Sequence, residues 1–378
     1  MRVAHVVRQY QPSIGGMEEV VRNLVQHQQT ETQYEPYVVT LDRVFREPET
    51  QLPSHETLDN VPVRRLSFRG SERYPLCPQV LKSLRKADLV HVHGIDFFFD
   101  YLALTQSLHG RPLLVSTHGG FFHTSFARRL KRLYFNSVTR ASVLAYRRVI
   151  ATSENDGDMF RQITGESRLR VIENGVDIHK FEGAGSKALQ PTLIYFGRWS
   201  VNKGILEALE LLAVLCAQQL DTPWRLIIAG REYDLTAEQI LAYAAKLGLG
   251  ERVDVIQGPS NNDLRALICR ASYFICLSHH EGFGIAPIEA MSAGLIPILS
   301  AIPPFKRLVT NTGVGLILDA TTPVGQAQQI AQLHQQMTSD GDSSVTRVDT
   351  VQRAARGYSW TTVAAQYVRQ YDQILDAR

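Results

Sequence analysis

Two carboxylates, Glu281 and Glu289, stand eight residues apart directly after a predicted strand at 273–277. The glycines and the proline between them favour a loop that turns into a helix, so the first N–H groups of that helix would face an anion. Glu289 would lie inside the helix and bind a ribose, and Glu281 would lie at its mouth and bind sugar hydroxyls. The residues expected at the helix N-terminus are Phe283, Gly284 and Ile285. Taken alone, the pattern fits a capped helix with two surface acids better.

Two basic residues follow another predicted strand, at 193–196, where the chain turns into a helix. Arg198 and Lys203 stand five residues apart across this loop, where a planar guanidinium and a compact ammonium can converge on a diphosphate. Such cations would neutralise charge on a leaving group. Arg231, after the predicted strand 225–229, is assigned to the same anion site. The alternative is a set of solvated loop cations.

The first predicted turn from strand to helix holds Gly15 and Gly16, immediately before a helix that begins near Met17. Small residues at a helix N-terminus let backbone N–H groups approach a phosphate, helped by the helix dipole. The spacing is not G-x-G-x-x-G, so a dinucleotide-binding fingerprint is not met. A purely structural turn explains the two glycines as well.

His118 follows a predicted strand at 113–116, at the edge where ligands bind in open parallel sheets. A neutral or protonated imidazole there can hydrogen-bond a substrate hydroxyl or stabilise developing charge. His91 and His93 lie in the preceding predicted strand, 89–93. They are interpreted as packed strand residues rather than catalytic groups.

Two D-x-D sequences imitate a metal-binding motif, because paired carboxylates can hold a hard cation. Asp156 and Asp158 fit a helix N-terminus that favours acids, and Asp340 and Asp342 fit an exposed loop. The four cysteines form no C-x-x-C pair and have no histidine partners at zinc spacing. We therefore expect neither a metal site nor a disulfide scaffold, and a reducing cytoplasm fits best.

The composition is that of a globular chain without a strongly charged partner. Of its 378 residues, 44% are hydrophobic and 20% are charged, which suits two domains with full cores and excludes a disordered chain. The net charge of +3 is too small to suggest binding to nucleic acid. The chain starts in a strand-like pattern without a secretory signal, and no uncharged apolar stretch is long enough to cross a bilayer.

The candidate residues must be positioned by short β-branched strands that alternate with amphipathic helices, a pattern typical of parallel sheets covered by helices. We expect an α/β protein with two facing, doubly wound, Rossmann-like domains. The predicted strands are 3–7, 38–41, 89–93, 113–116 and 149–151 in the first domain, and 193–196, 225–229, 253–256, 273–277, 296–299 and 315–318 in the second.

The first domain is expected to span 1–182. The small, glycine-rich and proline-terminated stretch 183–191 is interpreted as an exposed linker to the second domain, 192–358. The tail 359–378 carries an apolar stripe at helical spacing that must pack on another surface. We expect this tail to be a helix that crosses back to the first domain.

The Glu281…Glu289 segment resembles the E-x7-E element of the retaining glycosyltransferases of family 4, which have the two-domain GT-B fold. The loops described above and Asn174-Gly-Val-Asp177 also resemble that family, and the resemblance extends over the whole chain. It implies that the first domain binds the acceptor and the second the nucleotide-sugar donor, and that no metal is required.

The resemblance also implies individual roles. Gly16 and the N–H groups after Phe283 would meet the donor diphosphate, which Arg198 and Lys203 would neutralise.

Glu281 would hold the donor sugar, Glu289 the ribose, and His118 would contact the sugar near its reacting carbon. The reaction would proceed on one face of the sugar through an oxocarbenium-like state, with the leaving phosphate helping to deprotonate the acceptor.

Residues 6–9, 13–20, 92–97 and 197–204 resemble, more narrowly, the α-mannosyltransferases of acetan- and xanthan-type exopolysaccharide assembly in that family. This implies transfer of mannose from GDP-mannose to a polyprenyl-diphosphate-linked disaccharide, cellobiose, in an α-1,3 linkage, at the cytoplasmic face of the bacterial inner membrane. The alternatives are a UDP-sugar donor, because nothing in the sequence identifies the base, and a nucleotide-sugar-binding protein without turnover. A further alternative, an NAD-dependent oxidoreductase, is disfavoured because this chain lacks the glycine fingerprint of such enzymes.

A lipid-linked acceptor requires contact with a membrane, and residues 101–150 offer a surface for it. This stretch contains eight basic residues and no Asp or Glu. At ~100° per residue, Phe126, Leu130, Leu133 and Leu144 share one helical stripe. The residues assigned to anionic lipid are Arg128, Arg129, Lys131, Arg132 and Phe135. The alternative is a core-facing helix with a solvated basic face.

Overall fold

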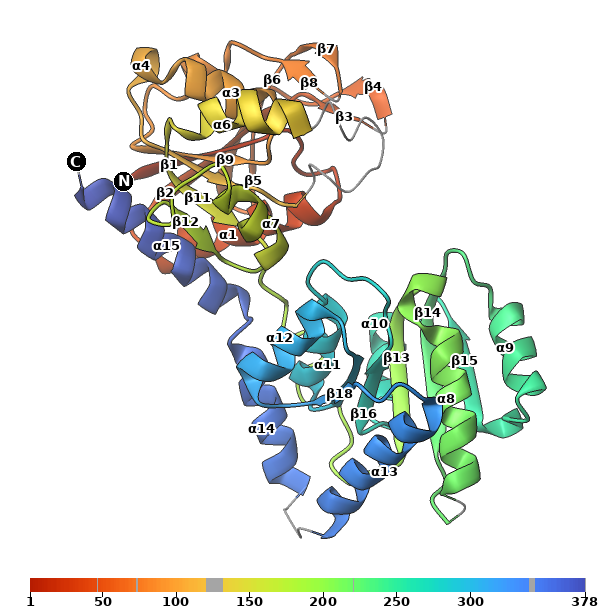
Figure 1. Ribbon diagram of the computed structural model, residues 1–378. Helices are drawn as coiled ribbons and strands as arrows, with labels where there is room; N and C mark the ends of the chain where they lie inside the picture. Colours follow the sequence, from red (N-terminus) through yellow and green to blue (C-terminus); the bar gives the residue numbers. More distant parts are fainter. Residues whose placement is uncertain (46, 73, 120–131, 220, 340–343, 378) are drawn as a thin grey trace. The chain divides into compact units, whose positions relative to one another are not determined.

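The computed structural model describes residues 1–377 except positions 46, 73, 120–131, 220 and 340–343 (Figure 1). The chain forms two compact units. Unit 1 comprises Met1–Gly175 and Trp360–Arg378, and unit 2 comprises Val176–Ser359. Each unit is a mainly parallel sheet covered by helices, which confirms the predicted α/β class with two Rossmann-like domains.

Unit 1 contains an eight-stranded sheet in the order β12-β11-β10-β9-β1-β2-β6-β5. Its strands are parallel except for the β5–β6 pair. The elements of the sheet and its covering helices are β1 (Arg2–Val7), α1 (Gly16–Glu31), β2 (Glu35–Leu41), β5 (His55–Leu58), β6 (Val61–Leu66), α2 (Val80–Ser83), β9 (Leu89–His93), α3 (Phe97–Leu104), α4 (Gln106–His109), β10 (Leu113–Ser116), η1 (Phe135–Thr139), α6 (Arg140–Val143), β11 (Tyr146–Ala151), α7 (Glu154–Arg161) and β12 (Leu169–Val171).

The centre of this sheet positions the site of unit 1. Strands β1, β9 and β10 are buried over almost their whole lengths, as expected for parallel strands covered on both faces. The chain runs from β1 to β2 on one side and later to β9 on the other. This reversal of direction makes the carboxyl ends of β1 and β9 the expected ligand edge.

Unit 2 contains a six-stranded parallel sheet in the order β15-β14-β13-β16-β17-β18. Its elements are β13 (Thr192–Trp199), η2 (Val201–Lys203), α8 (Ile205–Gln218), β14 (Arg225–Glu232), α9 (Ala237–Lys246), η3 (Gly250–Arg252), β15 (Val253–Gln257), α10 (Asn261–Ile268), β16 (Tyr273–Cys276), α11 (Ile285–Ala293), β17 (Ile296–Ser300), α12 (Pro303–Thr312), β18 (Leu316–Leu318), α13 (Pro323–Ser339) and α14 (Ser344–Arg356).

The last helix, α15 (Trp360–Asp376), belongs to unit 1, as the apolar stripe of the tail predicts. Its buried side chains Val363, Tyr367, Tyr371 and Ile374 pack with Val3 and other residues of the central strands. The two ends of the chain therefore meet in one core, and Figure 1 shows the N- and C-termini close together.

The predicted linker does not connect the two units. The boundary lies between Gly175 and Val176, and residues 183–191 run along unit 2. The N–H of Gly185 donates to the carbonyl of Ala293 at 2.8 Å, and the N–H of Gln190 donates to Ser272 Oγ at 2.8 Å. Glycine and proline content indicated an irregular segment correctly but could not show that its backbone is hydrogen-bonded to the unit.

The sequence also missed the small antiparallel strands between β2 and α2. These are β3 (Arg43–Val44), β4 (Glu47–Gln51), β7 (Arg69–Ser71) and β8 (Tyr74–Leu76), together with β5 of the main sheet. Most are exposed, so they lack the buried β-branched run by which most other strands were predicted. The largely buried strand β6 was missed as well.

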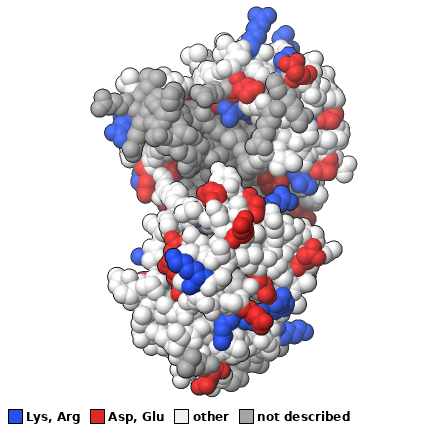
Figure 2. All heavy atoms as spheres, turned by 90° about the vertical axis from the view of Figure 1, so that its right-hand side faces the viewer, with Lys and Arg blue, Asp and Glu red and all other residues white. Residues whose placement is uncertain are grey.

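On the surface drawn in Figure 2, basic and acidic side chains are interspersed among uncharged ones. This agrees with the small net charge. Within the described ranges, no helix is both long and apolar enough to cross a bilayer.

Candidate active-site residues of the two units

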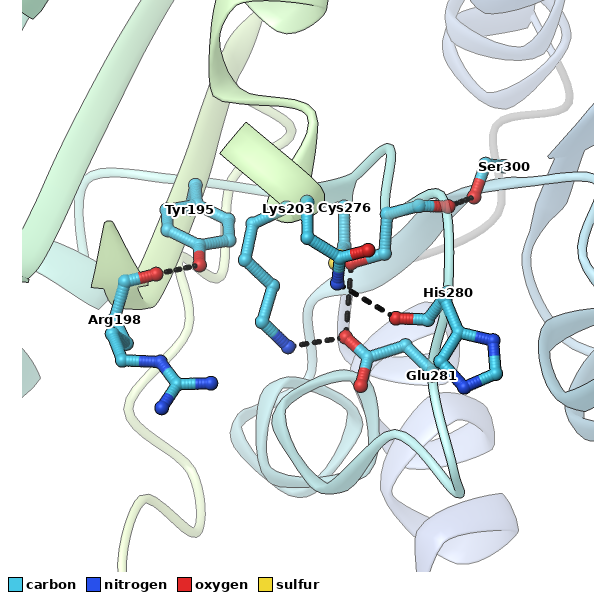
Figure 3. Close-up of polar contacts among 9 residues, drawn as sticks. Tyr195, Arg198, Lys203, Cys276, His280, Glu281 and Ser300 are labelled. Atoms are coloured by element: carbon cyan, nitrogen blue, oxygen red, sulfur yellow. Dashed lines mark hydrogen bonds and ion pairs between the residues drawn. The ribbon is translucent and has the colours of Figure 1, made fainter. Parts of the chain in front are cut away.

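The central feature of unit 2 is an ion pair between Lys203, in η2, and Glu281, in the loop after β16 (Figure 3). The Nζ atom of Lys203 contacts Oε1 of Glu281, and Ser278 Oγ donates to the same oxygen at 2.9 Å. The two charged side chains are only 21% and 15% exposed. Both contacts fall on Oε1, so Oε2 is the oxygen that a substrate hydroxyl can reach.

One side-chain and one backbone hydrogen bond hold the two loops together. Asn202 Nδ2 donates to the carbonyl of His280 at 2.9 Å, and the N–H of His279 donates back to the carbonyl of Asn202 at 2.9 Å. The next residue along, Gly204, has φ of +68° and passes so close that a Cβ atom would stand 2.2 Å from the Leu277 carbonyl oxygen. Glycine is thus required for Lys203 to reach Glu281.

Arg198 and Arg231 are neighbours across the β13–β14 pair. The sequence predicted Arg198 in a loop, but β13 continues through it to Trp199. Its guanidinium lies 4.4 Å from the centre of the Tyr233 ring, and Tyr195 donates to its backbone carbonyl at 2.8 Å (Figure 3). Among the described residues, neither arginine has a carboxylate within ion-pair distance. Two adjacent, exposed guanidinium groups are suited to an anionic ligand.

The helix α11 begins after Gly284, as predicted. Gly284 has φ of +97° and provides no side-chain cap, so the first N–H groups of the helix remain available to an anion. Ile285 is 49% exposed at this end, whereas Phe283 is half-buried against Tyr358 with 6.0 Å between ring centres.

Glu289 lies inside α11 with a side chain only 16% exposed. Burial raises the pKa of its carboxyl, and Lys180, whose Nζ lies 3.0 Å from Oε1, acts in the opposite direction. Lys180 was not predicted, because nothing in its local sequence pattern connects it with a helix more than a hundred residues later.

In unit 1, α1 begins at Gly16 as the turn predicts, and Gly15 is its N-cap without a side-chain cap. The carboxylate of Glu18 folds back over this end, because a Cβ atom on Gly15 would stand 2.3 Å from Glu18 Oε2. Gly15, Glu18 and Glu19 line a cavity of about 650 Å³. An anion bound here would have to share the helix N-terminus with two carboxylates.

His118 lies at the carboxyl end of β10 and is partly buried. Its backbone has φ of +52°, a left-handed conformation that is uncommon outside glycine and concentrates at functional sites. Burial lowers the pKa of its imidazole to about 4. Of the two predicted forms, neutral and protonated, the structure supports the neutral one at physiological pH.

Two further polar residues follow β1 and β9 at the same edge. Asp96 caps α3 by accepting from the N–H of Phe98 at 2.9 Å, and the Arg8 Nε atom lies 4.0 Å from Asp96 Oδ2. Burial raises the pKa of Asp96 to about 6. Neither residue was predicted, although the rule that selected His118 applies equally to positions that follow these strands.

The predicted lipid-facing residues are only partly described. Arg128, Arg129 and Lys131 lie outside the described residues, and Arg132 is exposed. Phe135 was assigned wrongly. It is 3% exposed in η1, where its ring packs edge-on against Phe160 with 5.3 Å between centres, so it belongs to the core of unit 1.

The first D-x-D sequence lies in the N-terminal half of α7, with Asp156 in the first turn of the helix as predicted. Asp156 accepts from the hydroxyl of Thr117 at 2.7 Å, while its N–H donates to the α7 N-cap Ser153, and Asp158 pairs with Arg161. Asp340 and Asp342 lie outside the described residues. His91 and His93 are buried strand residues, as predicted.

Comparison with known proteins adds independent evidence. Residues 14–180 match the model described as Glycosyltransferase Family 4, and residues 178–343 match Glycosyl transferases group 1. The GDP-mannose:cellobiosyl-diphosphopolyprenol alpha-mannosyltransferase of Xanthomonas campestris is 52% identical over 99% of this chain and 97% of its own length. The relative of the same name from Komagataeibacter xylinus is 41% identical over 99% of this chain and 94% of its own length.

Solved structures agree at the level of the fold. A glycosyltransferase from Rickettsia africae superposes with a TM-score of 0.72 at 16% identity, over 99% of this chain and 98% of that one. The lipopolysaccharide outer core galactosyltransferase WaaB gives a TM-score of 0.68 at 15% identity over both complete chains. The chain therefore belongs to the family 4 glycosyltransferases, and its two units are the Rossmann-like domains of a GT-B enzyme.

Proposed function

We propose that this glycosyltransferase transfers mannose from GDP-mannose to the cellobiose of a cellobiosyl-diphosphopolyprenol lipid, with retention of the anomeric configuration and formation of an α-1,3 linkage. Two relatives that match almost their whole length, at 52% and 41% identity, bear the name of this donor and acceptor. The observation that carries the proposal for this chain is the largely buried Lys203–Glu281 pair in the same unit as the adjacent, exposed Arg198 and Arg231.

In this proposal, unit 2 binds the donor. Lys203, Arg198, Arg231 and the N–H groups at Ile285 oppose the charge of the diphosphate, and that charge grows as the sugar–phosphate bond breaks. Gly284 keeps this helix end accessible. Positive charge placed where the leaving group becomes more negative stabilises the transition state more than the bound donor.

The two carboxylates position the sugar nucleotide. Glu281 Oε2 accepts from a mannose hydroxyl while Oε1 stays bound to Lys203 and Ser278. Glu289 accepts from the ribose hydroxyls, and this contact is the same in the ground and transition states.

Unit 1 binds the acceptor in the proposed assignment, and His118 hydrogen-bonds a substrate hydroxyl near the reacting carbon as a neutral group. Gly15 and Gly16 offer N–H groups to phosphate oxygens. In the transfer step, the bond from the anomeric carbon to the diphosphate oxygen breaks and a bond to the acceptor oxygen forms on the same face. The acceptor hydroxyl proton passes to the leaving diphosphate, so no protein nucleophile is used.

The donor is tested by incubating the protein with a cellobiosyl-diphosphopolyprenol lipid and either GDP-mannose or UDP-glucose, followed by mass spectrometry. We expect a product one hexose heavier from GDP-mannose alone, with an α-linked anomeric proton by NMR. A product from UDP-glucose alone would contradict the assignment of the donor, and a β linkage would contradict retention. No product from either, with GDP-mannose still bound, would favour a binding protein.

The proposal includes no metal, because the basic side chains of unit 2 supply the charge that a cation would otherwise provide. Turnover should therefore persist in excess EDTA. Loss of turnover in EDTA that is restored by Mg²⁺ would contradict this part of the proposal.

We also propose that unit 1 rests on the anionic cytoplasmic surface of the bacterial inner membrane as a peripheral protein. Several apolar side chains in the acid-free stretch are exposed, among them Leu104 at 81%, Leu108 at 78%, Leu133 at 65% and Leu144 at 64%. Leu104 lies in α3 and Leu108 in α4, whereas Leu133 lies just before η1 and Leu144 directly follows α6. The helices α3, α4 and α6 lie together at one end of unit 1 in Figure 1.

Charge and internal bonding support this surface. Arg132, Arg140 and Arg147 are exposed in the same region, and each basic residue near an anionic membrane contributes about 1 kcal/mol. The carboxylate of Asp100, in α3, accepts from Tyr134 and from Ser142, so these helices are joined by hydrogen bonds. Exposed leucines on a rigid base are suited to insertion at a lipid interface.

The surface is tested by flotation with vesicles that contain anionic lipid and with neutral vesicles. We expect salt-sensitive binding to the anionic vesicles, weakened about tenfold in a Leu133→Ser, Arg132→Gln double variant, in line with the loss of one charge and one apolar contact. Arg270→Gln, an exposed arginine of unit 2, is the control and should bind as the unmodified protein does. Equal binding to neutral vesicles would contradict the electrostatic part.

A further inference from the structure

A continuous row of buried polar side chains begins at His118 and crosses the centre of unit 1. His118 Nε2 lies 3.1 Å from His93 Nδ1, His93 Nε2 lies 3.0 Å from His5 Nδ1, and His5 Nε2 lies 3.0 Å from Gln28 Oε1. His5, His93 and Gln28 are at most 1% exposed. We call His118, His93, His5 and Gln28 the histidine relay.

The relay follows from the order of the strands. His5 lies in β1, His93 in β9 and His118 just after β10, which are neighbours in the sheet. Gln28 comes from α1, which packs on β1. Side chains that are far apart in the sequence are thus brought into one hydrogen-bonded row.

A second branch leaves Gln28 in the opposite direction. Its amide donates to the Tyr371 hydroxyl at 3.2 Å, and this hydroxyl lies 2.8 Å from His91 Nδ1. His91 Nε2 lies 2.8 Å from Ser116 Oγ, which donates to Tyr367 at 3.5 Å. The amide group of Gln28 therefore has its nitrogen in one branch and its oxygen in the other.

With the Gln28 amide oxygen directed toward His5 and its nitrogen toward Tyr371, each hydrogen bond of the relay can form in only one direction. A neutral imidazole has one donor and one acceptor nitrogen, and the Gln28 carbonyl oxygen can only accept. His5 must then donate from Nε2 and accept at Nδ1, and the same holds for His93. His118 must donate from Nε2 to His93, which leaves its Nδ1 as the acceptor nitrogen.

We propose that Gln28, His5 and His93 are positioning residues that fix His118 in the Nε2–H tautomer, so that His118 meets a substrate hydroxyl as a hydrogen-bond acceptor. Burial supports this arrangement, because it lowers the pKa of His5 to about 4 and that of His93 well below its usual value. A protonated imidazole has no acceptor nitrogen and would break the row. The role of His118 toward substrate rests on the proposed function, whereas its tautomer does not.

A metal ion is the alternative occupant of this region, because His5, His91 and His93 place one nitrogen each within 4.8 Å of the others. All six ring nitrogens of these residues already have a hydrogen-bonding neighbour in the distances given above. A bound cation would have to displace several of these contacts in a region that water does not reach.

The tautomer is measured directly by long-range ¹H–¹⁵N correlation spectra of the full-length protein labelled at histidine nitrogens, without substrate. The chain has 12 histidines, and the His118 signals are assigned by their loss in His118→Asn. We expect a single tautomer protonated at Nε2. A mixture of tautomers, or protonation at Nδ1, would overturn the proposal, and so would a stoichiometric metal found by elemental analysis.

Gln28→Met tests the effect at a distance of three hydrogen bonds from His118. We expect the His118 signals to shift toward a mixture of tautomers and kcat to fall by about 10-fold or more, as for other groups that orient a functional histidine, with little change in KM. Tyr367→Phe, at the far end of the second branch, is the matched control and should change neither. The activity is measured with whichever sugar nucleotide is turned over, so a different donor would leave this result intact. Unchanged kcat in Gln28→Met with a single tautomer in the unmodified protein would refute the positioning role.

Discussion

At the scale of single residues, burial of the Lys203–Glu281 pair affects both the stability of the protein and its proposed catalysis. Both charges are mostly removed from water, and removing either partner leaves the other buried and unpaired. The same burial makes the positive charge effective toward a leaving diphosphate, because electrostatic interactions strengthen when water is excluded. A loss of activity in a variant must therefore be separated from a loss of stability.

We predict that Lys203→Ala lowers kcat by about 100- to 1000-fold, the effect expected when a group that stabilises developing charge is lost. The midpoint of thermal unfolding of unit 2 should fall by about 10 °C, because an unpaired, largely buried Glu281 carboxylate costs about 3 kcal/mol and each kcal/mol shifts the midpoint of a domain of this size by about 2–4 °C. Steady-state kinetics and calorimetry of the same sample give both quantities. Arg270→Ala removes an exposed cation of the same unit and should leave both almost unchanged. A rate near that of the unmodified protein in Lys203→Ala would refute the proposed role.

The sequence predicted most of these residues because they follow strands, but it missed their partners. Lys180 has no spacing that connects it with Glu289, which it contacts. Arg8 and Asp96, in contrast, follow β1 and β9 and could have been found by the rule that selected His118. Phe135 was misassigned because an aromatic residue among basic ones has the same pattern whether it faces lipid or the core.

At the scale of secondary-structure elements, close backbone approaches decide where the side chains of unit 2 lie. Gly204 precedes α8 and passes against the end of β16, whereas Gly313 ends α12 in an open position. The two glycines have nearly equal φ, +68° and +67°, but only Gly204 would bring a Cβ atom against another backbone atom. Alanine substitutions at the two positions therefore separate the cost of the left-handed backbone conformation from the cost of the steric clash with Leu277.

We predict that Gly313→Ala costs about 1 kcal/mol of unfolding free energy, because only the left-handed conformation is penalised. Gly204→Ala should cost about 3 kcal/mol or more, because the loop must also move away from Leu277. Urea unfolding of both variants measures the difference. Equal losses would contradict the close approach of the two loops.

The predicted elements agree best where strands are buried on both faces. The strand predicted at 113–116 coincides with β10, and 89–93 coincides with β9. The predicted end at 196 was too early, because β13 continues to Trp199 through Gly197, a residue that suggested a turn. The exposed hairpins could not be predicted, since neither of their faces is continuously apolar.

At the scale of the whole molecule, the two units differ in their buried histidines. Burial lowers the pKa of both His5 and His118 to about 4, and those of His91 and His93 to well below the usual value. All four lie in unit 1. In unit 2, the pKa of His334 is also lowered by burial, but this side chain is only partly buried.

We predict that unit 1 loses stability as the pH falls from about 6.5 to about 4. In this window unfolded histidines bind protons and the folded ones do not, so unfolding takes up protons. For His5 alone the difference is on the order of 3 kcal/mol. Asp96, whose pKa is raised to about 6, acts in the opposite sense because the folded state binds its proton first, but it is one group against four.

Calorimetry at pH 7 and pH 5 measures this effect, and Gly204→Ala identifies the transition of unit 2 by lowering it. We expect the other transition to fall more steeply with pH. Equal shifts of the two transitions would contradict the lowered pKa values in unit 1.

The sequence by itself determined the alternation of strands and helices, the two-domain α/β class and the edge positions that carry Glu281, Lys203 and His118. These follow from local hydrophobic periodicity and from the rule that parallel strands present their carboxyl ends together. Only the tertiary structure decided which side chains these residues contact. The histidine relay needs β1, β9 and β10 side by side with α1 packed on them, and its second branch needs α15 from the other end of the chain. Such contacts depend on strand order and helix packing, which a one-dimensional pattern does not contain.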